Sequence, residues 1–373
     1  MQLSGQWLAS ISGPTNKGTA ILNLEHDGRQ YFGHACYFDD DPRLPGLVAT
    51  VHSVVQEPGN RVRISLNVNN CIRLTPRQLI PTDKVSEVFP GANAPSNAEL
   101  EGSLESYESY AAMQCQWSTN AATSGNVTLI RRNLASQSDL VSEILSWDDF
   151  KRDFADLSGR KSLFRGQQKR WILTSAFHRT GRCDLHHFDS DDLPTLARQL
   201  SPLTGRLYDL TNPLLKGALV NLVQHHGYPT PLLDWTLSPF IAAYFAFCDV
   251  PKNYLDDYVR IHILDEEMWG RLCVQDNFID TPFPTLTAFR LLGIDNARML
   301  PQQSVTTLSN LADIESFITT SEAKHGIKCL RAVDISTSER ERAMAELRVM
   351  GITAASMFPG IDGACKALKE YKF

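Results

Sequence analysis

The residues best placed to do chemistry lie in two segments, 160–182 and 224–247. The first segment has no acidic residue and holds seven basic ones: Arg160, Lys161, Arg165, Lys169, Arg170, Arg179 and Arg182. Such a cluster in an acidic chain attracts anions. Each Lys taken singly is explained as well by a solvated surface position.

Arg165 differs from the rest of the cluster because apolar residues precede it and Gly166 follows it. This pattern predicts a short buried strand that delivers one guanidinium into a cleft. The planar fork of Arg suits a phosphate or a carboxylate, and a glycine beside it would let a ligand approach the backbone. The alternative is a buried structural ion pair.

The second segment contains a clear helix start, Ser238-Pro239, before an apolar run. Ser caps the free N–H groups and Pro suits the first turn, and a helix start that faces a cleft favours an anion. Asp234 and Thr236 lie just before this start. Ser238 could serve only as a cap, and Asp234 could cap or pair with an Arg.

His225 and His226 open the same segment. Adjacent side chains on a helix point in different directions, so at most one of them is expected to face a cleft. Either could form a general-base pair with Asp234 in a hydrolase, or both could be ordinary turn histidines. The sequence has no Gly-x-Ser-x-Gly motif to support a serine hydrolase.

Composition limits the class of protein. The chain has 373 residues, 43% of them hydrophobic, and a formal net charge of −6, which predicts two domains and argues against a surface that coats nucleic acid. The longest apolar run, 240–248, is too short to cross a bilayer. With no signal-like start we expect a cytoplasmic protein without a membrane partner. The eight cysteines form no C-x-x-C pair, so no metal site is expected.

Residues 1–133 are predicted to form a β-rich domain, an antiparallel barrel or sandwich. Alternation places Val62, Ile64, Leu66 and Val68 on one face of a strand. The predicted strands are 6–12, 18–24, 30–37, 47–55, 61–68, 98–104, 112–117 and 126–131. Such a domain could hold a small ligand in its mouth, or a partner protein such as an antitoxin on its surface.

Residues 138–373 are predicted to form a mixed α+β domain. A helix is expected from Leu140 to Leu157, ended by Gly159. The other predicted helices are 194–200, 214–226, 239–247, 337–350 and 364–371. The predicted strands besides the one at Arg165 are 258–264 and 329–335.

The two chemical segments together resemble the FRG domain family, which is named after Phe-Arg-Gly. The match consists of Phe164-Arg165-Gly166-Gln167, Gln224-His225-His226-Gly227, Pro229-Thr230, Leu232 to Thr236, Ser238-Pro239 and Ala243 to Ala246, with extensions at Arg298 and Gln302. The resemblance covers roughly residues 145–370. The first 130 residues lie outside it.

A weaker resemblance is to ADP-ribosyltransferases of the Arg–Ser–Glu type. It implies a similar core fold, with NAD as substrate and no metal. By this resemblance Arg165 holds the ribose or phosphate, and Thr236 and Ser238 line the nicotinamide pocket. The implied dinucleotide site also takes in Gln167, His226 and Thr230, with Trp235 or Tyr244 as an aromatic platform.

Where this second family has a late Glu, the chain has Gln302 and Gln303. An amide can align a ribose hydroxyl but cannot neutralise the oxocarbenium ion that forms as nicotinamide leaves. Either the carboxylate role passes to Asp234, and the catalytic set becomes Arg165, Asp234 and Gln302, or turnover is weak or absent.

The function expected from these residues is an NAD-consuming ADP-ribosyltransferase or NAD glycohydrolase. It would act as a bacterial toxin or an anti-phage effector, with a nucleic acid or a protein as acceptor. The first alternative is a non-catalytic module that binds a nucleotide or a partner. The second is a hydrolase that uses His and Asp.

Overall fold

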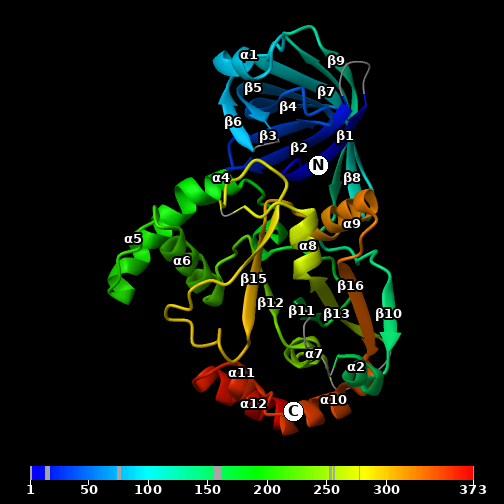
Figure 1. Ribbon diagram of the computed structural model, residues 1–373, viewed down its shortest axis with the longest axis vertical. Helices are drawn as coiled ribbons and strands as arrows, with labels where there is room; N and C mark the ends of the chain where they lie inside the picture. The colour runs from blue at the N-terminus through cyan, green and yellow to red at the C-terminus, as the bar shows by residue number, and fades with distance from the viewer. Residues whose placement is uncertain are drawn as a thin grey trace. The chain divides into compact units, whose positions relative to one another are not determined.

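The computed structural model describes residues 2–12, 17–73, 77–154, 161–251, 254, 257–276 and 278–372. They form two compact units, drawn in Figure 1. The first comprises Met1–Leu134 with Phe177–His187, and the second comprises Ala135–Ala176 with Phe188–Phe373. The predicted domains, 1–133 and 138–373, placed Phe177–His187 in the second domain, whereas its contacts group it with the first unit. No helix of the described residues is long and apolar enough to span a membrane.

The first unit is a closed antiparallel barrel of eight strands. Their order is β4-β3-β2-β1-β9-β8-β7-β5, and pairing of β4 with β5 closes the ring. The strands are β1 (Gly5–Ser12), β2 (Lys17–His26), β3 (Tyr31–Asp39), β4 (Gly46–Glu57), β5 (Arg61–Arg73), β7 (Asn97–Ser106), β8 (Tyr110–Thr119) and β9 (Ser124–Arg132). Seven of them contain a predicted strand in full, and β3 begins one residue later than the predicted strand 30–37. Of the two predicted architectures, the barrel is confirmed.

Alternating side chains point into the barrel and form its core. Val62, Ile64, Leu66 and Val68 of β5 all lie in its core, as the period of two predicts. A small satellite core forms where β6 (Gln78–Pro81), the short turn Thr82–Lys84 and α1 (Val85–Val88) pack beside β5. The sequence pattern missed β6 because four residues are too few to show a period.

The segment Phe177–His187 is attached to the barrel by buried polar contacts. It includes most of α3 (Ala176–Arg179) and all of α4 (Leu185–His187). The buried Glu25 carboxylate accepts hydrogen bonds of 2.8 Å from the backbone N–H groups of Cys183 and Asp184. Arg182 pairs with the same carboxylate, and Asp184 pairs with His34 at 2.8 Å. These partners make burial of Glu25 tolerable.

The second unit is built on a seven-stranded sheet that curves into a half-barrel. Its order is β10-β16-β13-β11-β12-β15-β14, with β10 and β16 parallel and every other pair antiparallel. The strands are β10 (Ser142–Leu145), β11 (Ser162–Gln167), β12 (Leu232–Thr236), β13 (Tyr258–Asp265), β14 (Leu286–Phe289), β15 (Ser304–Ser309) and β16 (Leu330–Ser336). The α+β class predicted for this region is confirmed.

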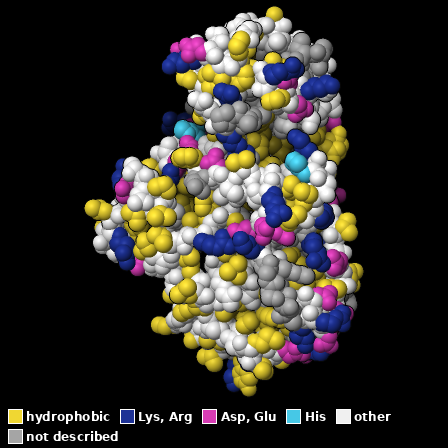
Figure 2. Space-filling model, viewed as in Figure 1, with side chains coloured by type: hydrophobic (Ala, Val, Ile, Leu, Met, Phe, Trp, Pro, Cys, Tyr) yellow, Lys and Arg dark blue, Asp and Glu magenta, His cyan; other side chains and the backbone are white. Residues whose placement is uncertain are grey.

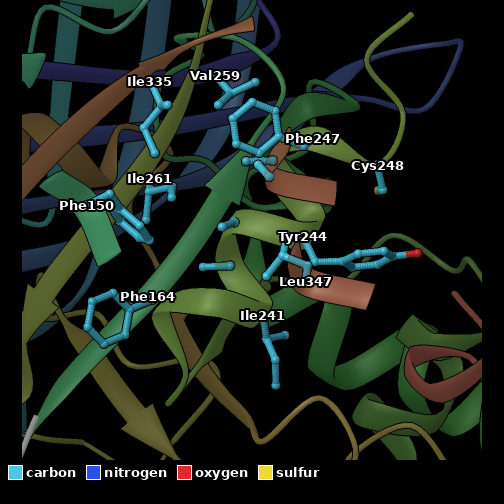
Figure 3. Close-up of a cluster of buried hydrophobic side chains, with 14 of the residues drawn as sticks. Phe150, Phe164, Ile241, Tyr244, Phe247, Cys248, Val259, Ile261, Ile335 and Leu347 are labelled. Carbon is cyan, nitrogen blue, oxygen red and sulfur yellow. The ribbon is translucent and has the colours of Figure 1, made fainter. Parts of the chain in front are cut away.

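Helices connect and cover this sheet. They are α2 (Trp147–Phe154), α5 (Leu193–Thr204), α6 (Pro213–His225), α7 (Pro239–Phe247), α8 (Glu266–Leu272), α9 (Ile314–His325), α10 (Arg340–Val349), α11 (Ala354–Met357) and α12 (Ile361–Lys372). A π-helical turn, Phe188–Asp192, precedes α5, and a 3-10 turn, Thr337–Glu339, precedes α10. Helix α7 packs on β11 and β13 through the core cluster of Figure 3.

Gly166 is required for this packing. A Cβ at this position would lie 1.8 Å from the carbonyl oxygen of Ala242 in α7. The missing side chain therefore lets the helix approach β11. Gly166 was predicted to open the backbone to a ligand, but the space beside it is filled by helix.

The predicted helix beginning at Leu140 is wrong at its start. Residues Ser142–Leu145 form β10, which pairs in parallel with β16, and α2 begins only at Trp147. Val141 and Ile144 are 90% and 68% exposed, so they are not part of a buried helix face. Leu157 and Gly159 lie outside the described residues.

Candidate functional site

Arg165 lies at the centre of the sheet, on β11 between β12 and β13. The ladder between β11 and β12 contains a single pair, Phe164 with Thr236. Next to that pair the Arg165 guanidinium reaches across, and its Nη1 donates a 2.6 Å hydrogen bond to the backbone carbonyl of Asp234. Arg165 is partly exposed. The short strand predicted around Arg165 is therefore found in the structure, as β11.

The Asp234 carboxylate is exposed and is held by one amide. Gln224, near the end of α6, donates from Nε2 to Oδ1 of Asp234 at 2.5 Å, and its Oε1 accepts the hydroxyl of buried Thr230. Although solvent reaches the carboxylate, protein atoms crowd it, and this desolvation raises the pKa of Asp234. The charge of Arg165 and the Gln224 hydrogen bond oppose the rise. The second oxygen, Oδ2, has no partner in the described part of the chain.

The start of α7 lies on the other face of the sheet from Arg165. Gly166 faces α7, so its neighbour Arg165 must point to the opposite face. Thr236 shares the face of α7 because it pairs with Phe164 of the core. The expectation that Arg165, Thr236 and Ser238 line one dinucleotide site does not fit this register.

The hydroxyls of Thr236 and Ser238 close the start of α7. Ser238 Oγ accepts the N–H of Ile241 at 3.3 Å, which is the predicted cap, and Thr236 Oγ1 accepts the N–H of Ser238 at 3.1 Å. Thr236 is buried. Both side chains therefore have a structural task.

The two rings predicted as a nicotinamide platform are buried. Trp235 is 2% exposed and donates its indole N–H to Thr307 at 3.0 Å. Tyr244 is 0% exposed, and Figure 3 shows its hydroxyl pointing away from the cluster, where it donates to Glu370 at 2.8 Å. Neither ring presents a face to solvent.

Gln302 lies near the junction of β12 and α7. Its Nε2 donates to the carbonyl of Met357 at 2.8 Å, and the adjacent Gln303 accepts the N–H of Leu237 through its carbonyl at 3.1 Å. Gln302 lies two residues before Ser304, which pairs with Thr236 between β15 and β12. The amide is therefore engaged in holding α11.

The tandem histidines end α6. His226 is exposed at the C-cap, and the rings of His225 and His226 lie 5.3 Å apart. Partial burial, with the nearby charges of Arg298 and His226, lowers the pKa of His225. In the described part of the chain, no hydrogen bond or ion pair joins either imidazole to Asp234. The predicted His–Asp base pair is therefore not formed in this structure.

The face of the sheet that carries Arg165 holds further buried polar groups that sequence reasoning missed. Arg260 and Asp334, 2% and 1% exposed, form a two-point ion pair of 2.8 and 2.9 Å. The hydroxyl of Ser138 accepts a third hydrogen bond from Arg260. Gln167 of β11 pairs with Arg260 of β13 and so lies beside it on the same face. The Oε1 atom of Gln167 is buried and has no partner among the described residues.

His262 lies directly beside Arg165 in the register of β11 and β13. It is fully buried, and its Nε2 lies 3.1 Å from Oε1 of Glu315. Burial, more than any charge, lowers the pKa of His262, although Glu315 opposes the effect. A neutral ring that donates from Nε2 has a lone pair on Nδ1, which has no partner in the described chain. Alternation in 258–264 could have placed His262 beside Arg260, but nothing in the sequence pointed to Glu315.

The basic side chains of residues 160–182 that the structure describes do not form one continuous positively charged surface. Lys169 lies over the ring of Tyr254, and Arg170 lies over Tyr258 and 3.7 Å from Asp257. Arg179 and Arg182 belong to the first unit, and Arg160 lies outside the described residues. On the face shown in Figure 2, basic and acidic side chains are interspersed.

Among the residues with described positions, no three His, Cys, Asp or Glu side chains are grouped to hold a metal ion. The site therefore consists of Arg165 with the Asp234 backbone, the Asp234 carboxylate with Gln224 and Thr230, and the buried polar groups behind Arg165.

Comparison with known proteins gives one match. A model of the FRG domain family matches residues 160–254, from the beginning of β11 to just past α7. No curated protein and no solved structure matches the chain. The weaker resemblance to ADP-ribosyltransferases gains no support from these comparisons and stays a prediction. The family resemblance is confirmed for part of its predicted span: the chain carries an FRG domain at residues 160–254.

Proposed function

We propose that the second unit consumes NAD, as an ADP-ribosyltransferase or an NAD glycohydrolase. The observation that carries the proposal is a partly exposed guanidinium bonded to the backbone of Asp234, whose exposed carboxylate leaves β12 on the face of Thr236 but still lies within reach of the Arg165 charge. Arg165 binds the backbone of Asp234, and Gln224 fixes the Asp234 side chain. A cation for the pyrophosphate or ribose and an anion for a developing positive charge are what this reaction needs.

In the reaction the bond between ribose C1′ and the nicotinamide nitrogen breaks, and its electron pair leaves with nicotinamide. The ribose becomes an oxocarbenium ion, which the ionised carboxylate of Asp234 stabilises. Water or an acceptor then bonds to C1′ and gives up a proton, which Asp234 or solvent accepts. Because the pKa of Asp234 is raised, the rate should increase as the pH rises through that pKa.

The test incubates the full chain with NAD and follows free nicotinamide, with and without nucleic acid and protein acceptors. Arg165→Ala and Asp234→Asn should each lower the rate at least 100-fold, a loss typical of one charge-stabilising group. Arg206→Ala is the matched control, because Arg206 forms an exposed ion pair with Asp295 in the same unit. If the wild type releases no nicotinamide under any of these conditions, the proposal is wrong.

A second function, binding of a nucleotide without chemistry, is favoured by a specific observation. Trp235 and Tyr244 are buried, and Gln302 is engaged with Met357, so three of the residues expected to contact NAD have other tasks. This alternative predicts that NAD raises the melting temperature and is recovered intact. Loss of the shift in Arg165→Ala, with no product at any time, would favour it.

A role as a toxin or anti-phage effector would follow from NAD consumption in a cell. Expression in a bacterial host should then slow growth and lower cellular NAD, and Arg165→Ala should relieve both effects. Growth inhibition that persists in Arg165→Ala would separate toxicity from this site. The acceptor, a protein or a nucleic acid, would be identified by the label transferred from NAD.

A further inference from the structure

The interior of the barrel contains an apolar cavity of about 260 Å³. It belongs entirely to the first unit and is lined from β1 to β9, with the loops around Pro45 and Pro95 at its rim. None of the described residues that line it is charged. An apolar cavity of about 150 Å³ is already enough to hold benzene.

Small side chains at inward positions account for the cavity. Barrels of this strand number are usually just wide enough for their own side chains to fill. Here four inward positions are alanines: Ala20, Ala35 and Ala49 on the adjacent strands β2, β3 and β4, and Ala98 on β7. At the other end, large residues such as Trp7 and Met113 are fully buried. The barrel is thus closely packed on one side and hollow on the other.

One polar atom in the cavity wall lacks a partner. Trp117 of β8 lines the cavity, and its indole Nε1 is buried without an acceptor in the described chain. Gly125, opposite it on β9, makes room for the ring, because a Cβ there would lie 2.9 Å from that Nε1. A buried N–H without an acceptor is costly. An acceptor on a guest molecule would remove this cost.

We propose that the barrel binds a small, uncharged, mainly apolar molecule that carries one hydrogen-bond acceptor, such as a ketone or an ester. The apolar wall selects the body of the ligand, and the absence of charged lining residues disfavours an ionised one. Trp117 Nε1 donates to the acceptor. This site is independent of the NAD-consuming site proposed in the second unit.

The test uses two probes of similar shape, acetophenone and ethylbenzene, on the full chain. Calorimetry should show saturable binding of both, with acetophenone roughly three- to ten-fold tighter because only its carbonyl can accept from Trp117. Trp117→Phe removes the donor and should reduce this ratio to about one. No saturable binding by the wild type, or equal affinity for the two probes, would overturn the proposal.

A second set of variants tests whether the probes bind in the cavity, by filling it with a larger side chain. Ala98→Leu should abolish binding of both probes, whereas Glu99→Leu, the next residue on β7 and exposed, should leave both affinities unchanged. Circular dichroism verifies the fold of each variant. If Ala98→Leu does not fold, Ala35→Val is the milder replacement and should weaken both probes. Binding that survives in a folded, filled variant would place the ligand elsewhere.

Discussion

The barrel and the seven-stranded sheet bury their interiors in different ways. The inside of the barrel is apolar and leaves a hollow, with Trp117 Nε1 as an unpartnered polar atom in its wall. The sheet packs one apolar face against α7, whereas its opposite face buries the Arg260–Asp334 pair and the His262–Glu315 contact beside Arg165, next to an apolar cluster that includes Leu163 and Trp235. An apolar interior tolerates exchange of side chains of similar volume, but a buried ion pair depends on both partners.

This difference predicts which substitutions should reduce the stability of the protein most. A substitution inside the barrel changes volume, and neighbouring side chains can adjust. A substitution on the polar face leaves a charge in the interior without its partner, which no adjustment of packing repairs. The following predictions test this contrast, and the first has the largest expected effect.

Asp334→Leu should destabilise the second unit by about 3–5 kcal/mol, because it leaves the buried guanidinium of Arg260 unpaired. In the barrel, Met113→Leu should cost under about 1.5 kcal/mol, since Met113 is equally buried but is replaced by a side chain of similar volume. Denaturant unfolding of the full chain, with a probe for each unit, measures both. Equal losses would remove the contrast.

The double variant Arg260→Leu/Asp334→Leu sharpens this test. With both charges gone, most of the loss in the single variant should be recovered, because no unpaired charge remains. A double variant as unstable as Asp334→Leu alone would show that the pair contributes through its geometry, including the bonds to Ser138 and Ser142.

Gly166→Ala should destabilise the second unit by about 1–3 kcal/mol or more, because the new Cβ would collide with the Ala242 carbonyl in α7. Gly270→Ala is the control: Gly270 lies in α8, and a Cβ there meets no atom within 4 Å. That change should be neutral or stabilising by up to about 1 kcal/mol. Thermal unfolding compares the two variants, and a harmless Gly166→Ala would mean that α7 can move away.

The smallest effect is expected at the attachment of Phe177–His187 to the barrel. Burial would lower the pKa of His34, but the Asp184 carboxylate outweighs burial and raises it. The pair therefore stabilises fully below the unfolded His pKa of about 6.5 and weakens as the pH rises through the folded pKa of His34. Unfolding at pH 6 and pH 8.5 should show a loss of the order of 1 kcal/mol in the wild type. His34→Gln should lack this loss; if it keeps it, another group is responsible.

The sequence predicted the barrel well because its strands pair mainly with their neighbours in the chain. Alternation in β5 placed its core residues correctly, and short turns joined the strands. The second unit was harder, since β10 pairs with β16 and β13 with β11, far apart in the sequence. Val141 and Ile144 fit a helical period, yet distant backbone hydrogen bonds held that segment as a strand.

For the site, local signals identified the Arg165 strand and the Ser238 cap. They could not show which face each side chain takes, because that depends on register. The contact of Arg165 with the Asp234 backbone joins residues 69 positions apart, and the His262–Glu315 contact joins residues 53 apart. Only the alternation in β13 hinted that His262 shares a face with Arg260.

The grouping of Phe177–His187 with the barrel means that the chain passes between the two units more than once. A barrel fragment that ends at residue 134 would lose the strip Phe177–His187, which covers Glu25. The remaining fragment would expose Cys183 and Leu185, which are buried in the full chain. Fragments intended to isolate either half should therefore carry Phe177–His187 with the barrel, by circular permutation or by co-expression. Because residues 160–254 include the strip, the FRG region carries part of the barrel's own structure.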